Sequence, residues 1–304
     1  MKKKDHSPRG KRQTDEIDSS AMPYDMALLF PVLFLVGIGI VMVYSASSAL
    51  AREALKPEYF FLKKQMFFGM AGVVVLVVFR HFPFQWFRAL AYPILVVAIG
   101  LLIATQVPGL GIKAGGATRW IRVAGVSFQP SEVARFAMVV YLAYSLSKKK
   151  ENVRTFSIGF FPHMVVLGIL VFLILMQPDF GSVAILCMIT WLMLFIGGVP
   201  IFHLSSTCIV ALPVVYFIIA NAEYRLKRIT GFLDPWQYPT DEGYQIIHSL
   251  MAFGSGGIWG AGIGKSYQKL FYLPEPHTDF IFSVVGEELG LVGVAVILGL
   301  YALI

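Results

Sequence analysis

The sequence predicts an all-α, polytopic membrane protein with eight transmembrane helices. Hydrophobic residues make up 57% of the 304 residues and charged residues only 14%, whereas soluble domains are roughly 45 to 50% apolar and about 25% charged. Charge-free segments cover residues 26–51, 89–112 and 180–222, and the last is long enough for two spans of about 20 residues each. Such continuous runs favour helices over a membrane barrel, whose strands alternate apolar and polar residues.

Each predicted span lies between charged residues or turns that contain Gly and Pro. The first follows the charged N-terminal segment, the second lies between Lys64 and Arg80, and the third follows Arg88. The fourth begins in "FQPSE" and ends before "KKK", the fifth ends at "QPDFG", and "GGVP" divides the sixth from the seventh. The eighth begins near Asp279. The expected ranges are 26–48, 65–79, 89–106, 130–147, 157–176, 180–197, 202–221 and 279–304.

The chain is expected to contain one tail and one transmembrane domain. Residues 1–24 are charged, contain Ser, Pro and Gly and have no apolar periodicity, which predicts a disordered cytoplasmic tail. The apolar run that follows exceeds the roughly 7 to 15 residues of a signal peptide core. Residues 25–304 then form the transmembrane domain, including a long loop at 222–278. We expect this domain to be C-terminally incomplete, because its last span has no polar flank.

Basic residues orient the predicted spans. The tail, the loop with Arg80 and Arg88, and the "SLSKKKENVRTF" segment fall on one side, which predicts a cytoplasmic N-terminus in the cytoplasmic membrane. The long loop 222–278 then faces outward, and a loop of that length is usually functional. The outer loops also carry several Lys and Arg residues, which indicates that something outside requires positive charge.

Composition narrows the classes of ligand. A net charge of +7 suits anionic lipid headgroups or a phosphorylated substrate, and nucleic acid is excluded for so apolar a chain. Cys187 and Cys208 lie in apolar runs, and neither they nor the separate histidines have metal-ligand spacing. The glycines before Lys265 do not have the spacing of a nucleotide-binding P-loop. They are expected to allow close backbone packing, with "HSLMAFG" as a short amphipathic helix.

Two polar clusters precede the long loop. Glu132 and Arg135 are three residues apart and can pair on one helical face, as a structural ion pair or as part of a cavity where Arg119, Arg122 and Arg135 meet an anion. Asp179 lies in the "QPDFG" turn, where chemistry alone favours a helix cap over a binding role.

The third cluster is in the last span. Glu287 and Glu288 are expected to face protein, to pair or to be protonated, because an ionised carboxylate at mid-bilayer costs at least about 2.5 to 3.5 kcal/mol. A step of 100° per residue places Asp279, Ser283, Gly286 and Gly290 on one face, so Asp279 is expected at the mouth of a small-residue groove. Asp279 is then either an N-cap or a base at the rim of a cavity.

A series of motifs resembles the SEDS family of shape, elongation, division and sporulation proteins. The match extends from Tyr24 to Ile304 and is most similar to the division branch of that family. The motifs, in order, are "GGATRWI", "FQPSE", "QPDFG", "FLDPW", "GYQ", "GSGG" with "GKS", "LPEPHTDFIF" and "GEELG".

The resemblance implies a SEDS fold of ten helices, eight of them in this chain. It also implies a peptidoglycan glycosyltransferase that polymerises lipid II into glycan strands outside the cytoplasmic membrane, at the division septum. The implied partners are a class B penicillin-binding transpeptidase and other divisome membrane proteins. No cofactor is evident, although a divalent cation is compatible with the reaction.

The resemblance also implies the site. Asp279, in the "HTDF" motif, corresponds to the family's catalytic aspartate, and Glu132 belongs to the same polar cavity. The family usually has Lys where this chain has Arg135, which argues against a deprotonated amine there. The residues expected to bind substrate or pyrophosphate are Arg119, Arg122, Glu132, Arg135, Asp179 and Lys265.

Three alternatives remain open at the level of sequence. A lipid II flippase would also place acids and Arg in the membrane, but inverted repeats are not evident. A non-catalytic divisome scaffold would tolerate the loss of Asp279. An elongation or sporulation polymerase would use the same chemistry in another process.

Overall fold

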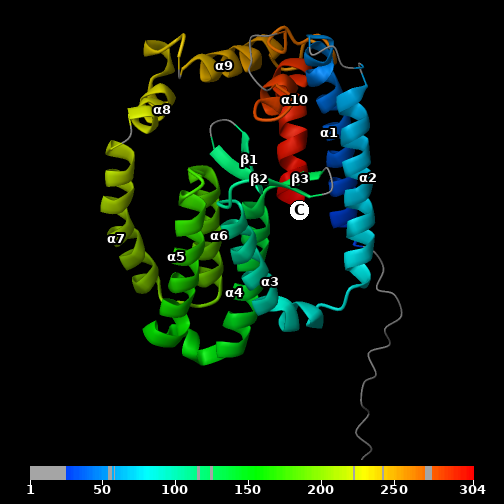
Figure 1. The fold of residues 1–304 in the computed structure, drawn as a ribbon. Coiled ribbons are helices and arrows are strands. Elements are labelled where there is room, and N and C mark those ends of the chain that lie inside the picture. Colours follow the sequence, from blue (N-terminus) through cyan, green and yellow to red (C-terminus); the bar gives the residue numbers. More distant parts are fainter. Residues whose placement is uncertain are drawn as a thin grey trace, which may run out of the picture. The chain divides into compact units, whose positions relative to one another are not determined.

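The computed structural model describes residues 25–53, 57, 59–114, 117–123, 126–221, 223–241, 243–270 and 276–304, so the predicted tail lies outside the described part. The fold is mostly helical (Figure 1). By its contacts the chain divides into two compact units. One consists of residues 1–72 and 231–304, and the other of residues 73–230.

A helix covers each of the eight predicted spans. Their ends differ from the predicted ones by a few residues, as expected when boundaries are judged from charge alone. Five are long and apolar enough to cross a membrane, namely the segments 26–48, 60–81, 85–104, 156–175 and 281–303. The chain is therefore a multi-pass membrane protein, and the number of eight spans stays a prediction. The helices are α1 (Met26–Glu53), α2 (Phe60–His81), α3 (Gln85–Ala104), α4 (Pro130–Lys149), α5 (Phe161–Leu175), α6 (Phe180–Ile196), α7 (Ile201–Ala220) and α10 (Ile281–Leu303).

A small sheet differs from the all-α expectation, and the long loop contains more helix than expected. A three-stranded antiparallel sheet lies between α3 and α4 in sequence, with β1 (Gly111–Ala114), β2 (Ala117–Val123) and β3 (Val126–Phe128) in that order. Strands this short show few alternations of apolar and polar residues. The charged residues within them therefore made the segment resemble a loop. The long loop contains α8 (Glu223–Leu233), a 3-10 turn (Pro235–Gln237) and α9 (Tyr244–Gly256). Helix α9 confirms the predicted amphipathic helix.

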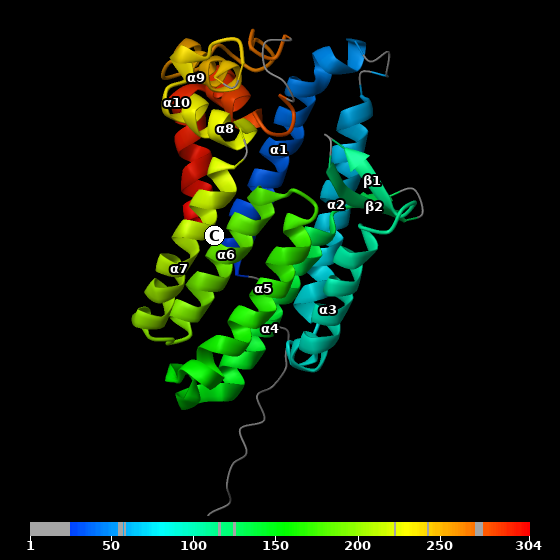
Figure 2. The ribbon, with the colours of Figure 1, turned by 60° about the vertical axis from the view of Figure 1, so that its left-hand side comes forward.

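The core of the unit 73–230 is formed by α3, α4, α5 and α6, which run side by side in Figure 2. Small and branched apolar side chains such as Ala137, Leu142 and Leu170 are fully buried between them. Two buried polar side chains there have partners: the His163 ring lies 3.0 Å from Ser145 Oγ, and Gln177 Nε2 donates to Thr105 Oγ1 at 2.7 Å. These bonds offset the cost of taking polar groups out of water.

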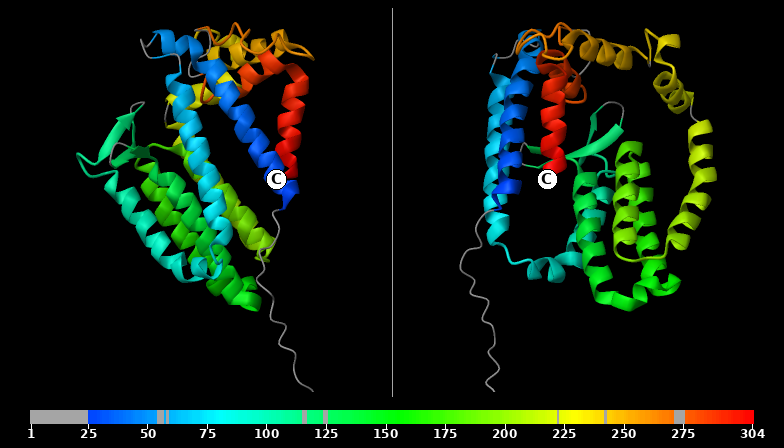
Figure 3. Two further views of the ribbon diagram at one scale, coloured as in Figure 1. Left: turned by 90° about the vertical axis from the view of Figure 1, so that its right-hand side faces the viewer. Right: turned by 180° about the vertical axis from the view of Figure 1, so that it is seen from behind.

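In the other unit α1 packs against α10, which lies beside it in the right-hand view of Figure 3. Met42 and Ala46 of α1 lie buried in one apolar cluster with Val284 and Val285 of α10. Helix α9 covers another face of α10, with Ser249 Oγ 2.6 Å from Ser283 Oγ. A Cβ on Gly256 of α9 would clash with the backbone of Gly286, so the two helices approach to backbone contact.

Helix α10 is interrupted at Gly290, whose φ of 66° and ψ of −168° are not helical. The break leaves backbone groups without partners inside an apolar segment, which is costly in a membrane. The glycine-rich segment 257–262 supplies them. Ala261 N donates to Glu287 O at 2.9 Å and Gly262 N to Glu288 O at 3.0 Å, while Leu291 N donates to Gly257 O at 2.9 Å. Close backbone packing, as predicted for these glycines, is confirmed.

Candidate functional site

Asp279 lies in the turn 276–280 that leads into α10, and its side chain is exposed. The turn packs against the rest of the protein: Pro276 is buried, and the centre of the His277 ring lies 4.9 Å from that of the Phe61 ring of α2. Phe280, not Asp279, is the N-cap residue, and no side chain caps the helix. The capping alternative for Asp279 is therefore wrong, and within the described residues its carboxylate has no hydrogen bond or ion pair.

The small-residue groove expected beside Asp279 is absent from the described surface, because protein fills it. Helix α9 covers Ser283 and Gly286, and Phe253 stands where a Cβ on Gly286 would be. The turn that contains Gly260 covers Gly290. The small face of α10 is thus a packing surface, and Asp279 stands beyond it.

Glu287 is buried at 1% exposure and binds the segment that follows the glycines. Its carboxylate accepts from Tyr267 N at 3.0 Å, from Gln268 N at 3.2 Å and from the hydroxyl of Ser266. Three donors stabilise the charge of a buried carboxylate. As expected, this acid faces protein.

Glu288 is also 1% exposed, and it pairs with Lys269. Lys269 Nζ lies 2.7 Å from Glu288 Oε1 and 3.0 Å from Ser45 Oγ, and Ser45 Oγ donates to Glu288 Oε1 at 2.7 Å. This polar cluster joins α1, α10 and the segment 266–269. The sequence reading missed Lys269 and Ser45. The signal was a Lys within an apolar, glycine-rich stretch and a Ser in a predicted span, where each needs a polar partner.

Asp179 caps α6. Its carboxylate accepts from Ser182 N at 3.2 Å, from Ser182 Oγ at 2.7 Å and from Gln129 Nε2 at 2.9 Å, and the residue is buried. The capping alternative accounts for these contacts, so Asp179 offers no exposed carboxylate to a ligand. Gln129, which sequence reasoning missed, is the first residue of the "QPSE" motif and ties that motif to the "QPDFG" turn.

Arg119 and Arg122 both lie on β2, and Arg119 falls at an irregularity where the register of β2 against β1 shifts. Arg119 Nε donates to Gln177 O at 3.2 Å and its Nη2 donates to Pro178 O, which fixes β2 to the "QPDFG" turn. Arg122 is exposed, and its Nε lies 3.4 Å from Ser127 Oγ. Arg119 is thus engaged with the turn and Arg122 is exposed, and the expectation that both arginines meet one anion stays a prediction.

Glu132 and Arg135 form the predicted i, i+3 ion pair in the first turns of α4. The Glu132 side chain is 56% exposed and that of Arg135 is 22% exposed. The Nε of Arg135 is buried without a hydrogen bond among the described residues. The Glu132 carboxylate is therefore accessible to solvent, and Arg135 Nε remains a donor without an acceptor among the described residues.

Lys265 belongs to the other unit and lines a cavity of about 400 Å³ with Ser266, Tyr267 and Lys269. Its ammonium group is exposed, unlike that of Lys269. The predicted site residues thus fall into two groups. Arg119, Arg122, Glu132, Arg135 and Asp179 lie in the unit 73–230, whereas Lys265 and Asp279 lie in the unit that contains α10.

Known proteins match this sequence and fold along most of the chain. A family model described as a cell cycle protein, FtsW/RodA/SpoVE, matches residues 26–304. "Probable peptidoglycan glycosyltransferase FtsW" of Trichlorobacter lovleyi is 48% identical over 278 residues, which are 91% of this chain and 73% of that protein. "Stage V sporulation protein E" of Bacillus subtilis is 38% identical over 280 residues, covering 92% and 76% of the two chains.

A solved structure shares the fold. It belongs to a study of polymerization and crosslinking by a peptidoglycan synthase complex, and it matches with a TM-score of 0.71 and 26% identity over 93% of this chain and 76% of that one. Together with the helices and motifs described above, these matches show that the chain belongs to the FtsW/RodA/SpoVE family of cell cycle proteins.

Proposed function

We propose that this protein is a peptidoglycan glycosyltransferase that polymerises lipid II into glycan strands at the outer face of the cytoplasmic membrane. The family membership and the names of the relatives support the reaction. The observation that carries the site is the state of four acids. Asp179, Glu287 and Glu288 are buried and hydrogen-bonded, whereas Asp279 is exposed and has no partner among the described residues.

Asp279 acts as the general base. A sugar 4-hydroxyl attacks the anomeric carbon of a second lipid II molecule, the new C–O bond forms as the bond to the lipid pyrophosphate breaks, and the hydroxyl proton passes to Asp279. One carboxylate is sufficient for this direct, inverting displacement. A general base must contact the hydroxyl group whose proton it accepts. Its carboxylate therefore has to be accessible to the substrate, as the exposed carboxylate of Asp279 is.

The departing pyrophosphate requires positive charge, which lowers the free energy of the transition state. The exposed guanidinium of Arg122, the accessible Arg135 and the exposed ammonium of Lys265 are the proposed contacts, with Glu132 orienting Arg135. Arg119 and Asp179 act differently from the sequence-based assignment. Arg119 holds the "QPDFG" turn and Asp179 caps α6, so both position this part of the protein.

The N-terminus is proposed to be cytoplasmic, with the segment 222–278 outside and the protein at the division septum. A class B transpeptidase and other divisome membrane proteins are the proposed partners, in keeping with the similarity to a complex that polymerises and crosslinks. The proposed reaction needs no resident cofactor. A divalent cation stays compatible with the reaction, as expected from the sequence.

Strand synthesis by the purified chain with its transpeptidase partner tests the proposal. Labelled lipid II is incubated with the wild type, Asp279→Asn or Asp241→Asn, and glycan strands are separated on a gel. Asn keeps the shape of Asp but cannot accept the proton, so Asp279→Asn should lower the rate by roughly 100-fold or more. Asp241→Asn, an exposed acid of the same long segment, should retain the wild-type rate.

Three outcomes would contradict the assignment in different ways. Normal strands from Asp279→Asn would remove it as the base. Transport of lipid II across vesicles without any strands from the wild type would favour a flippase. Neither activity, with intact binding of the transpeptidase, would favour a scaffold.

A further inference from the structure

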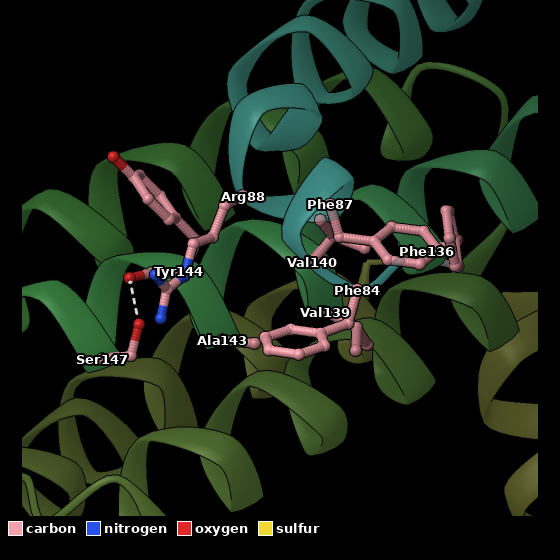
Figure 4. A pocket seen from close by; sticks show the side chains of 9 residues that line it. All are labelled: Phe84, Phe87, Arg88, Phe136, Val139, Val140, Ala143, Tyr144 and Ser147. Carbon is pink, nitrogen blue, oxygen red and sulfur yellow. Dashed lines mark hydrogen bonds between the residues drawn. The ribbon is translucent and has the colours of Figure 1, made fainter. Parts of the chain in front are cut away.

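A groove of about 440 Å³ lies between α3 and α4, and none of the residues assigned to the reaction is among those that line it. Figure 4 shows its side chains: Phe87 and Phe136 meet at one end, and Arg88 stands with Tyr144 and Ser147 at the other. A second cavity, of about 520 Å³, continues from the polar end and adds Lys148 to the lining. The groove therefore changes from apolar to cationic along its length.

One stripe of α4 forms the floor of the groove. The residues that line it recur at steps of three or four, which places them on one helical face. The stripe extends over residues 136–147, so its ends lie roughly 16 Å apart at 1.5 Å per residue. It consists of Phe136, Val139, Val140, Ala143, Tyr144 and Ser147.

Aromatic packing fixes the apolar end. The Phe87 ring of α3 lies 6.2 Å from the Phe136 ring, edge to face, and 6.0 Å from the Phe79 ring. Such pairs hold ring positions beyond simple burial of area. The apolar walls are thus built from rings with fixed neighbours, and they enclose a site with a defined width.

The cationic end holds unused positive charge. Arg88 is exposed and makes no hydrogen bond or ion pair to any described residue. Lys148 Nζ lies 5.7 Å from the centre of the Tyr144 ring, and Ser147 offers a hydroxyl beside it. The nearest basic neighbour, Lys149, is already engaged with the carbonyl oxygen of Ile158. Among the residues whose side chains the structure describes, no acid lines either cavity, so Arg88 and Lys148 can bind an anion.

We propose that this groove binds an anionic glycerophospholipid, with one acyl chain along the α4 stripe and the phosphate between Arg88 and Lys148. One wall of the groove is α3, which is long and apolar enough to cross a membrane, so lipid is available to the groove. Charge selects the lipid: Lys and Arg near a membrane surface each favour anionic headgroups by about 1 kcal/mol.

Retention of lipid by the purified full chain tests the proposal. Protein reconstituted in vesicles with equal parts of phosphatidylglycerol and phosphatidylcholine is extracted in mild detergent, and the bound lipid is quantified by mass spectrometry. The wild type should retain phosphatidylglycerol in excess. Arg88→Gln should reduce that preference about fivefold, and Arg88→Gln with Lys148→Gln roughly 30-fold. Arg154→Gln, which removes an exposed cation outside the groove, should leave it unchanged.

Ala143→Trp distinguishes lipid binding inside the groove from a general attraction of anionic lipid to positive charge. It fills the middle of the stripe and should reduce the retention of both lipids. Equal losses in Arg154→Gln and Arg88→Gln would show a diffuse field instead of a site and would overturn the proposal. An unchanged ratio of retained phosphatidylglycerol to phosphatidylcholine in the double variant would also overturn the proposal. So would displacement of the lipid by equimolar polyprenyl pyrophosphate, or crosslinking of another protein to the groove in place of lipid.

Discussion

Lys269 Nζ lies 2.7 Å from Glu288 Oε1, and both side chains are buried. Through this pair the glycine-rich segment is fixed to the broken helix α10 and, by Ser45, to α1. Removing one partner of a buried ion pair leaves the other charge buried without a counter-ion, which lowers the free energy of unfolding.

Lys269→Met should destabilise the fold by about 3 to 5 kcal/mol, because it strands the Glu288 carboxylate without its counter-ion. Lys269→Met combined with Glu288→Leu should cost less than the single change. Thermal unfolding of the detergent-purified protein measures both. Lys265→Met, an exposed Lys four residues earlier, is the matched control, and equal melting temperatures for the Lys265 and Lys269 variants would contradict the role of the pair.

Gly260→Ala should destabilise the protein strongly. Gly260 has φ of 81°, and a Cβ there would clash with the backbone of Glu288 and Gly290. Both strain and the loss of the hydrogen bonds that repair the α10 break oppose the change. Gly254→Ala in α9 is the control, because nothing lies within 4 Å of its added methyl group. It should be neutral or stabilising by up to about 1 kcal/mol.

Asp179→Ala should lower the free energy of unfolding by about 1 to 2 kcal/mol, the usual cost of removing an N-cap. Asp179→Asn should cost less, since its side-chain oxygen can still accept from Ser182 N. Denaturant or thermal unfolding ranks the two variants. A fully stable Asp179→Ala protein that had lost lipid II binding would instead support the substrate role.

Glu132→Ala should separate stability from activity. The Glu132 side chain is more than half exposed, so loss of its ion pair should change stability by about 0 to 1 kcal/mol. Strand synthesis should fall roughly tenfold or more if Glu132 orients Arg135 toward pyrophosphate. Arg154→Ala serves as the surface control. Unchanged synthesis by Glu132→Ala would leave the pair with a structural role only.

Labelling of a single cysteine tests the proposed topology. Cys187 and Cys208 are first replaced by Ala, and Asp241→Cys then supplies an exposed thiol in the long segment. A membrane-impermeant maleimide should modify it in intact spheroplasts. Modification only after the membrane is permeabilised would reverse the orientation and remove the proposed site from the outer face.

The long helices could be predicted because hydrophobicity fixes them locally. A charge-free run such as 26–48 has one low-energy solution in a bilayer, a helix that satisfies its own backbone. The pairing of Glu132 with Arg135 could also be predicted, because it depends only on spacing within one helix. The sheet at 111–128 was missed because its hydrogen bonds join different segments, and no single segment carries the signal.

The sequence by itself determined that this is a multi-pass helical membrane protein of a recognisable family, because composition, periodicity and motifs are properties of the linear chain. The tertiary structure decided which of its acids are available. Asp179 was expected to cap a helix and Glu287 and Glu288 to face protein, but the groups that hold them come from distant segments that the sequence does not identify: Gln129, Ser266 and Lys269. Whether a carboxylate is stabilised or left exposed depends on groups that only folding brings within about 3 Å of it, and this distinguishes Asp279 from the other three.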